Sequence, residues 1–200
     1  MLGKRADHTV LPRGTGSAAR PALIAAAIGV VETAGTPAVT LSDISAAAGV
    51  DAGVAPDMFA SVDDLLVEAA LQMCADDLRL AAVAETTGAP TVSAYAHHFA
   101  RRRVFYRAMR HGAVAETLDA RMAELMAPLI TVQIRTLVGS RMTEDAIAAL
   151  AVEVTAESFD VTNQWIVESD EAEGAESLYM RLEAIVLRRL DDARRMRGER

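Results

Sequence analysis

The chain has 200 residues, of which 52% are hydrophobic and 4% aromatic, and its formal net charge is −8. A chain of this length forms one large domain or two small ones, and its apolar fraction can fill a core. Alanine is abundant and strictly alternating β-branched runs are missing, which excludes a sheet-based architecture. Because Ala, Leu, Met and Glu favour helix, the composition predicts an all-α fold.

The same numbers bear on the compartment. The basic N-terminus has no apolar core, so it is unlike a secretory signal. No apolar stretch approaches the roughly 20 residues that span a bilayer. The single cysteine, Cys74, excludes an internal disulfide and suits a reducing compartment. We therefore expect a cytoplasmic protein without membrane association, in which Cys74 is a small buried side chain.

The first elements follow from end signals. Residues 1–19 are polar and aperiodic, which predicts a flexible basic tail. A helix is expected over Pro21–Ala34, because proline suits a first helical position and Gly35 can end the helix. Thr40 with Asp43 is an acidic variant of the capping box and predicts the start of a second helix.

A short third segment completes a recognisable pattern. The second helix stops at Gly49, and Asp51 can cap a third helix that runs towards Phe59. Ser61 with Asp64 is another cap signal and opens a long helix. A helix, a tight glycine turn and a short helix are the parts of a helix-turn-helix module.

The rest of the chain predicts further helices. One is expected over Thr91–Gly112, and the next over Ala113–Leu137 with a break at Pro128. Thr143 caps a long helix, and a last helix follows the acidic loop Glu168–Glu176.

The region from Ala22 to Leu66 carries an ordered set of landmarks: Gly35, Thr40, Ile44, Ala48-Gly49-Val50, Gly53, Phe59, Ser61 and Leu65-Leu66. Their order and spacing resemble the DNA-binding module of the TetR family of bacterial repressors. The resemblance implies about nine helices in three parts: a basic tail at 1–19, a helix-turn-helix module at 20–66, and a helical ligand-binding and dimerisation domain at 67–200. It also implies a homodimer in which the last two helices pair with those of a second chain.

The resemblance assigns candidate site residues. DNA contacts would come from Thr40, Ser42, Asp51, Ala52, Gly53, Val54 and Pro56. A small apolar or amphipathic effector would bind among Tyr95, Phe99, Phe105, Met109, Met122, Met126 and Trp165, although such a stripe also suits a plain helical core. The dimer interface would use Ile147, Leu150, Val154, Val161, Leu182 and Ile185.

The third segment departs from the family pattern where DNA contact is made. The family typically has Ser-Lys-Gly-Thr-Leu-Tyr there, whereas Asp51–Phe59 offers acid, alanine, valine, proline and methionine. Residues 21–78 contain no Lys or Arg and nine acidic residues. Phosphate contacts come mostly from cations, hydroxyls and helix N-termini, so these changes weaken DNA contact. Pro56 is expected either to shorten the third helix or to begin it.

Two functions therefore stay open. The first is a TetR-like transcriptional regulator, most simply a repressor, which binds operator DNA with help from the basic tail. It would release the DNA when an effector shifts the equilibrium between two conformations. The alternative is a TetR-fold protein that has lost DNA binding and acts through a ligand or a protein partner. No nucleophile, metal-ligand spacing or cofactor motif is present, so we expect no enzyme, no metal and no cofactor.

The arginines between 101 and 110 also leave alternatives open. Arg103, Arg107 and Arg110 share a helix face. They form either a solvated, ion-paired face or an anion site for a carboxylated ligand or an acidic partner, and phosphate contact is a third option.

Overall fold

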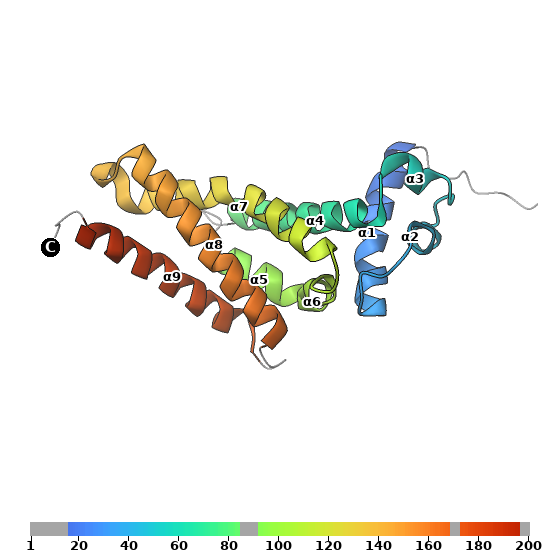
Figure 1. Cartoon of the computed structure of the whole chain (residues 1–200). Helices are drawn as coiled ribbons and strands as arrows, with labels where there is room; N and C mark the ends of the chain where they lie inside the picture. Colours follow the sequence, from blue (N-terminus) through green and yellow to red (C-terminus); the bar gives the residue numbers. More distant parts are fainter. Residues whose placement is uncertain (1–15, 85–91, 169–172, 197–200) are drawn as a thin grey trace, which may run out of the picture.

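A computed structural model describes residues 16–84, 92–168 and 173–196, and in these residues helices are joined by turns, without strands. Figure 1 shows α1–α3 gathered at one end and α7–α9 extending towards the other. The helices are α1 (Gly16–Ala34), α2 (Leu41–Ala48), α3 (Val54–Met58), α4 (Val62–Ala84), α5 (Val92–Arg101), α6 (Arg103–Met109), α7 (Val114–Val138), α8 (Glu144–Glu168) and α9 (Ala175–Met196), with a 3-10 turn at Gly139–Arg141. The all-α prediction is confirmed.

The ends of α2 form as the sequence predicts. Thr40 Oγ1 accepts a hydrogen bond from the Asp43 backbone at 3.1 Å, and Asp43 Oδ2 accepts one from the Thr40 backbone at 3.0 Å. This reciprocal capping box satisfies two of the backbone donors that a helix start leaves open. Gly49 ends α2 with φ 65, in the left-handed region that glycine adopts without strain.

The third helix corrects the predicted cap at Asp51 and the alternative that it begins at Pro56. It begins at Val54, with Gly53 as its cap, rather than at Asp51 or Pro56. The Asp51 carboxylate instead accepts a 3.4 Å hydrogen bond from the Gly53 backbone within the preceding turn. Pro56 is the third residue of α3, where its missing N–H would have had no partner within the helix. Proline therefore neither breaks nor starts this helix.

The first helix begins earlier than predicted, at Gly16 rather than Pro21. Ala19 is already buried, and Arg20 donates hydrogen bonds to both carboxylate oxygens of Glu68 on α4 at 2.9 and 2.5 Å. These contacts hold a turn that the sequence placed in the tail. Residues 1–15, most of the predicted tail, lie outside the described residues.

Two predictions about the middle helices are wrong. The expected helix over 91–112 is divided at Arg102 (φ −107, ψ 18) into α5 and α6. The expected break at Pro128 is missing, and α7 is continuous through it. Pro128 and Glu124, whose carbonyl loses its donor, both lie on an exposed side of α7, where solvent can satisfy that carbonyl.

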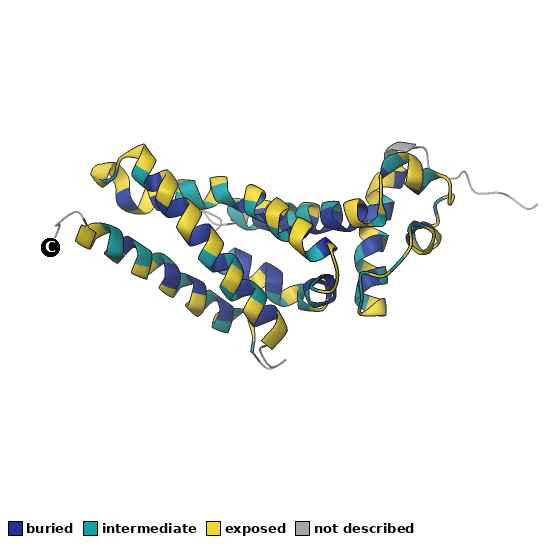
Figure 2. Cartoon of the chain, viewed as in Figure 1, coloured by how far each residue is buried: buried dark blue, intermediate teal, exposed yellow. Residues whose placement is uncertain are grey.

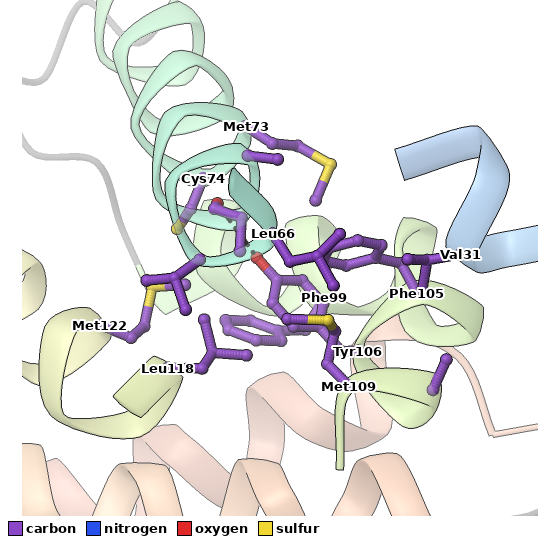
Figure 3. Packing of buried hydrophobic residues seen from close by; sticks show 14 of the residues in the cluster. Val31, Leu66, Met73, Cys74, Phe99, Phe105, Tyr106, Met109, Leu118 and Met122 are labelled. Carbon is purple, nitrogen blue, oxygen red and sulfur yellow. Dashed lines mark hydrogen bonds between the residues drawn. The ribbon is translucent and has the colours of Figure 1, made fainter. Parts of the chain in front are cut away.

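Most of the core is one cluster that runs from α1 to α9 (Figure 2). Figure 3 shows part of it, where Phe99, Tyr106 and Met109 meet Leu118 and Cys74. A smaller cluster joins the far end of α7 to α8 and α9 through Ile134, Val138, Ile147, Leu150, Ala151, Val154 and Leu190. No helix among the described residues is long and apolar enough to cross a bilayer.

Candidate functional site

The helix-turn-helix candidates lie at the start of α2, in the α2–α3 turn and in α3. Thr40, Ser42, Asp51, Ala52, Gly53 and Pro56 are exposed, and Val54 is half-buried. These positions are therefore open to a partner, but the Thr40 hydroxyl is already engaged with Asp43. The hydrogen bonds from Thr40 lower the pKa of Asp43, so a carboxylate persists at the α2 N-terminus. A phosphate at that helix end would meet a negative charge.

Arg20, the basic residue beside the helix-turn-helix candidates, is already engaged in an ion pair. Arg20 is the only basic residue from 16 to 78, and it pairs with Glu68 while its guanidinium lies 4.6 Å from the centre of the Phe59 ring. This contact fixes α1 against the end of α3 and the start of α4. It leaves the α2–α3 face with acidic side chains and without a described cation of its own.

The arginines between 101 and 110 bind carbonyl groups and carboxylates of the chain itself. Arg103 donates to the Trp165 carbonyl at 3.1 Å and lies 4.3 Å from the Trp165 ring centre, while Arg107 donates to the Ile166 carbonyl at 2.9 Å. Both side chains therefore cap the C-terminal carbonyls of α8. Arg101, Arg102 and Arg110 pair with carboxylates, at 2.9 Å from Asp77, 3.9 Å from Glu32 and 2.8 Å from Asp119. These partners favour the ion-paired interpretation over an anion site.

An apolar pocket lies among α4, α5, α7, α8 and α9. It contains about 640 Å³ of unfilled space, part of it open to solvent, and Tyr95 and Met126 are among its lining residues. The other ligand-binding candidates do not line it. They are Phe99, Phe105, Met109, Met122 and Trp165, and all are buried in the main core cluster. Figure 3 shows Phe99, Phe105, Met109 and Met122 packed there.

Sequence reasoning missed most of the pocket wall. Ile130 and Ile134 follow Met126 at four-residue spacing on α7, and Val154 and Ser158 on α8 are also four residues apart. That spacing marks an inward face, which the sequence alone assigns equally to a filled core or to a cavity. The signal was therefore present, but it does not distinguish the two.

The dimer candidates face inward. Ile147, Leu150, Val154, Leu182 and Ile185 are covered by the chain's own helices, and Val161 is half-buried against the same core. Val154 and Leu182 also line the pocket. The exposed large apolar side chains on α8 and α9 are instead Val152, Val167, Met180, Leu187 and Met196. A contact between copies through these helices would have to use that outer set.

A buried polar network joins α4, α5 and α6. His98 is fully buried, with Nδ1 2.7 Å from an Asp77 carboxylate oxygen and Nε2 2.7 Å from the Tyr106 hydroxyl. Burial lowers the pKa of His98 despite the neighbouring carboxylate, and burial raises the pKa of Tyr106. Burial opposes ionisation of Asp77, but hydrogen bonds from His98 and Arg101 outweigh it and lower its pKa. The network holds a neutral imidazole between a carboxylate and a phenol.

The described residues contain no group of three or more His, Cys, Asp or Glu side chains placed to hold a metal ion. Burial raises the pKa of the Cys74 thiol to about 12, which makes it an inert core side chain.

Comparison with known proteins gives a likeness in fold. No family model and no curated protein sequence matches this chain. A solved structure from Pseudomonas aeruginosa PAO1, described as a proposed transcriptional regulator, is similar at a TM-score of 0.59 and 17% sequence identity. The similarity covers 95% of this chain and 99% of the other, so the two share one fold over nearly their whole length.

Proposed function

We propose that this protein is a TetR-like transcriptional regulator, a homodimer that responds to a small apolar or amphipathic effector. The observation that carries the proposal is the placement of α4. Its first turns pack beside α1 in the helix-turn-helix module, and further along the same helix Leu78 lines the pocket. A ligand that prefers one position of α4 would therefore change the position of α2 and α3.

The α2–α3 face sets a condition on this proposal. Its exposed carboxylates repel phosphates, and Arg20 is held by Glu68. Operator affinity must therefore draw on the basic residues before α1, namely Lys4, Arg5 and Arg13. Counterion release by those contacts would make binding steeply dependent on salt.

The test is fluorescence anisotropy of the protein with DNA from its own upstream region, titrated over a range of salt concentrations. We expect Lys4→Ala/Arg5→Ala to weaken binding and to reduce the salt slope by about 0.9 for each lost phosphate contact. Arg194→Ala/Arg195→Ala, at the far end of α9, is the matched control and should leave the slope unchanged. Equal effects of the two double variants would contradict a role for the N-terminal basic residues.

The alternative is a TetR-fold protein without DNA binding, which acts through a ligand or a protein partner. The acidic α2–α3 face favours it. Under this alternative no DNA binds even at low salt. Asp51→Ser, Ala52→Lys, Val54→Thr and Pro56→Tyr together should then create DNA affinity, because they remove a carboxylate and add a cation and hydroxyls.

A further inference from the structure

A buried chain of hydrogen bonds meets α4 at two points. The Asp77 carboxylate lies 2.7 Å from Nδ1 of His98, and Nε2 of His98 lies 2.7 Å from the Tyr106 hydroxyl. That hydroxyl also lies 3.5 Å from the carbonyl oxygen of Ala70, again on α4. Figure 3 shows the Tyr106 hydroxyl directed towards α4. Ala70 and Asp77 are seven residues apart, which places both contacts on one face of that helix.

This network lies where the helix-turn-helix module joins the larger domain. Both α4 and α6 pack against α1, and Arg102, at the turn before α6, is 3.9 Å from Glu32 of α1. Leu78, the residue after Asp77, lines the apolar pocket. A change in the contact between α6 and α4 would therefore act on both the module and the pocket.

The partners of His98 decide which of its ring nitrogens carries the proton. An ionised carboxylate such as that of Asp77 only accepts hydrogen bonds, so Nδ1 must donate to it. Nε2 of the neutral ring then has a free lone pair, and it accepts the hydrogen bond of Tyr106. In this arrangement the single proton of the Tyr106 hydroxyl points to α5. The Ala70 carbonyl, at 3.5 Å, is farther away than in a normal O–H···O bond.

A second proton on the His98 ring reverses its bond to Tyr106. Nε2 then donates, so the phenol oxygen must accept, and the phenol's own proton has to turn away from His98. Tyr106 is only 1% exposed, and the Ala70 carbonyl is the acceptor that the described residues place within its reach. A normal O–H···O bond of about 2.8 Å requires the two oxygens to approach by roughly 0.7 Å. Protonation therefore favours a closer contact between α6 and α4.

The charges around the ring set the pH at which this happens. Burial is the largest influence and lowers the pKa of His98 below its ordinary value of 6.5. The Asp77 carboxylate favours the charged ring, whereas Arg101 and Arg102 oppose it. The buried side chains of α9, which packs on α5, are apolar. The charged and titratable side chains of the network and its surroundings come from α1, α4, α5, α6 and the turn between α5 and α6, and they are Glu32, Cys74, Asp77, Arg101, Arg102 and Tyr106.

We propose that a proton taken up by His98 transfers the Tyr106 hydrogen bond from the imidazole to the Ala70 carbonyl and draws α6 towards α4. Nε2 gains one proton from solvent, while the phenol keeps its own proton and changes only its acceptor. The switch is a property of the fold and does not depend on DNA binding. Its effect on operator affinity rests on the proposed function, because α4 packs beside α1 of the helix-turn-helix module.

The experiment is a pH titration of the full-length chain by NMR, with carbon-13 and nitrogen-15 labels. The histidine ring nitrogens report where the proton is, and the Ala70 carbonyl carbon reports hydrogen bonds to its oxygen. We expect neutral His98 to carry its proton on Nδ1, and the Ala70 carbonyl signal to shift with the same midpoint as His98, below pH 6.5. A neutral ring protonated on Nε2, a ring that stays neutral until the chain unfolds, or an Ala70 signal that does not follow His98 would each overturn the switch.

Tyr106→Phe separates the role of the hydroxyl from that of the imidazole. His98 should still titrate in this variant, but the Ala70 carbonyl should no longer respond, because the group that reaches it has been removed. Tyr95→Phe is the matched control, because Tyr95 is another buried tyrosine, on α5, and takes no part in these hydrogen bonds. An Ala70 response that persists in Tyr106→Phe would mean that the proton acts without this hydroxyl, and the inference would be wrong. The titration of the unmodified chain decides the matter even if Tyr106→Phe is less stable.

DNA affinity at about pH 7.5 and about pH 5.5 tests the consequence for regulation. We expect the ratio of the two affinities to differ by about twofold or more between the unmodified chain and Tyr106→Phe. Equal ratios in a chain that shows the switch would overturn its coupling to the module. A chain that shows the switch and binds no DNA at either pH would contradict the regulator and keep the switch. DNA binding by a chain without the switch would do the reverse.

Discussion

At the scale of single residues, His98 links the stability of the fold to pH. It lies against Asp77 of α4, Arg101 and Arg102 beside it in the chain, and Tyr106 of α6. Burial holds the pKa of folded His98 below its ordinary value of 6.5. The unfolded chain therefore binds a proton at a higher pH than the folded chain does, and the free energy of unfolding falls as pH drops below about 6.5.

We expect His98→Gln to flatten this dependence between neutral pH and about pH 5, while lowering stability at neutral pH by disturbing two hydrogen bonds. Urea unfolding followed by the fluorescence of Trp165 over a series of pH values measures both effects. His97→Gln is the matched control, because His97 is the exposed neighbour on the same helix and should leave the pH dependence intact. The same slope in both variants would show that His98 is not the titrating group.

At the scale of helices, the start signals at Thr40, Ser61 and Thr143 were predictable from the sequence, whereas the Asp51 cap and the start at Pro21 were wrong. The caps at Thr40, Ser61 and Thr143 form, and their hydroxyl oxygens accept hydrogen bonds of 3.1, 3.0 and 3.4 Å from backbone N–H groups. Each depends only on residues three positions apart, so a sequence contains the whole signal.

The division between α5 and α6 is different in kind. His98 and Tyr106 are eight residues apart, which on a continuous helix is a rise of about 12 Å. Their rings lie 5.4 Å apart and share a hydrogen bond, which the turn at Arg102 permits. No glycine or proline marks that turn. The break follows from which groups need partners in the folded core, and no local pattern encodes it.

Capping of α8 by Arg103 gives a prediction at this scale. Arg103→Ala removes hydrogen bonds to α8 carbonyls and the cover over Trp165, so we expect the free energy of unfolding to fall by about 1.5–3 kcal/mol. Urea unfolding measures this change. Arg121→Ala is the control, because Arg121 and Glu124 form an exposed pair on one helix that should contribute no more than about 0.5 kcal/mol. Equal decreases in the free energy of unfolding of the two variants would mean that the α8 cap stabilises the fold no more than an exposed ion pair does.

At the scale of the whole molecule, the outer faces of α8 and α9 bear on dimerisation. Arg188 and Arg189 of α9 pair with Glu157 of α8, and Leu182 and Ile185 are buried, so the inner faces are already in use. The sequence could identify α8 and α9 as helices with an apolar stripe. It could not tell that this stripe packs inside the chain, because burial by the chain itself and burial by a partner select the same residues.

What remains for a partner is the opposite stripe. Met180 and Leu187 are seven residues apart on α9, with exposed Ala184 between them, and Val152 with Ala156 forms a similar exposed strip on α8. These helices pack on each other, and we expect the two strips to lie on one outer face of the pair. Two copies related by a two-fold axis would bury the strips against each other as a four-helix contact.

We therefore expect the protein to be a dimer at micromolar concentration and Leu187→Glu to shift it to the monomer, since a carboxylate would be buried without a partner at the centre of the contact. Light scattering with size-exclusion chromatography measures the mass. Val104→Glu is the matched control, because Val104 is 61% exposed on α6 and Leu187 is 58% exposed on α9. A dimer that survives Leu187→Glu but not Val104→Glu would place the interface at α6. If the unmodified protein is a monomer, it cannot bind a two-fold symmetric operator as a dimer, and this part of the proposal is wrong.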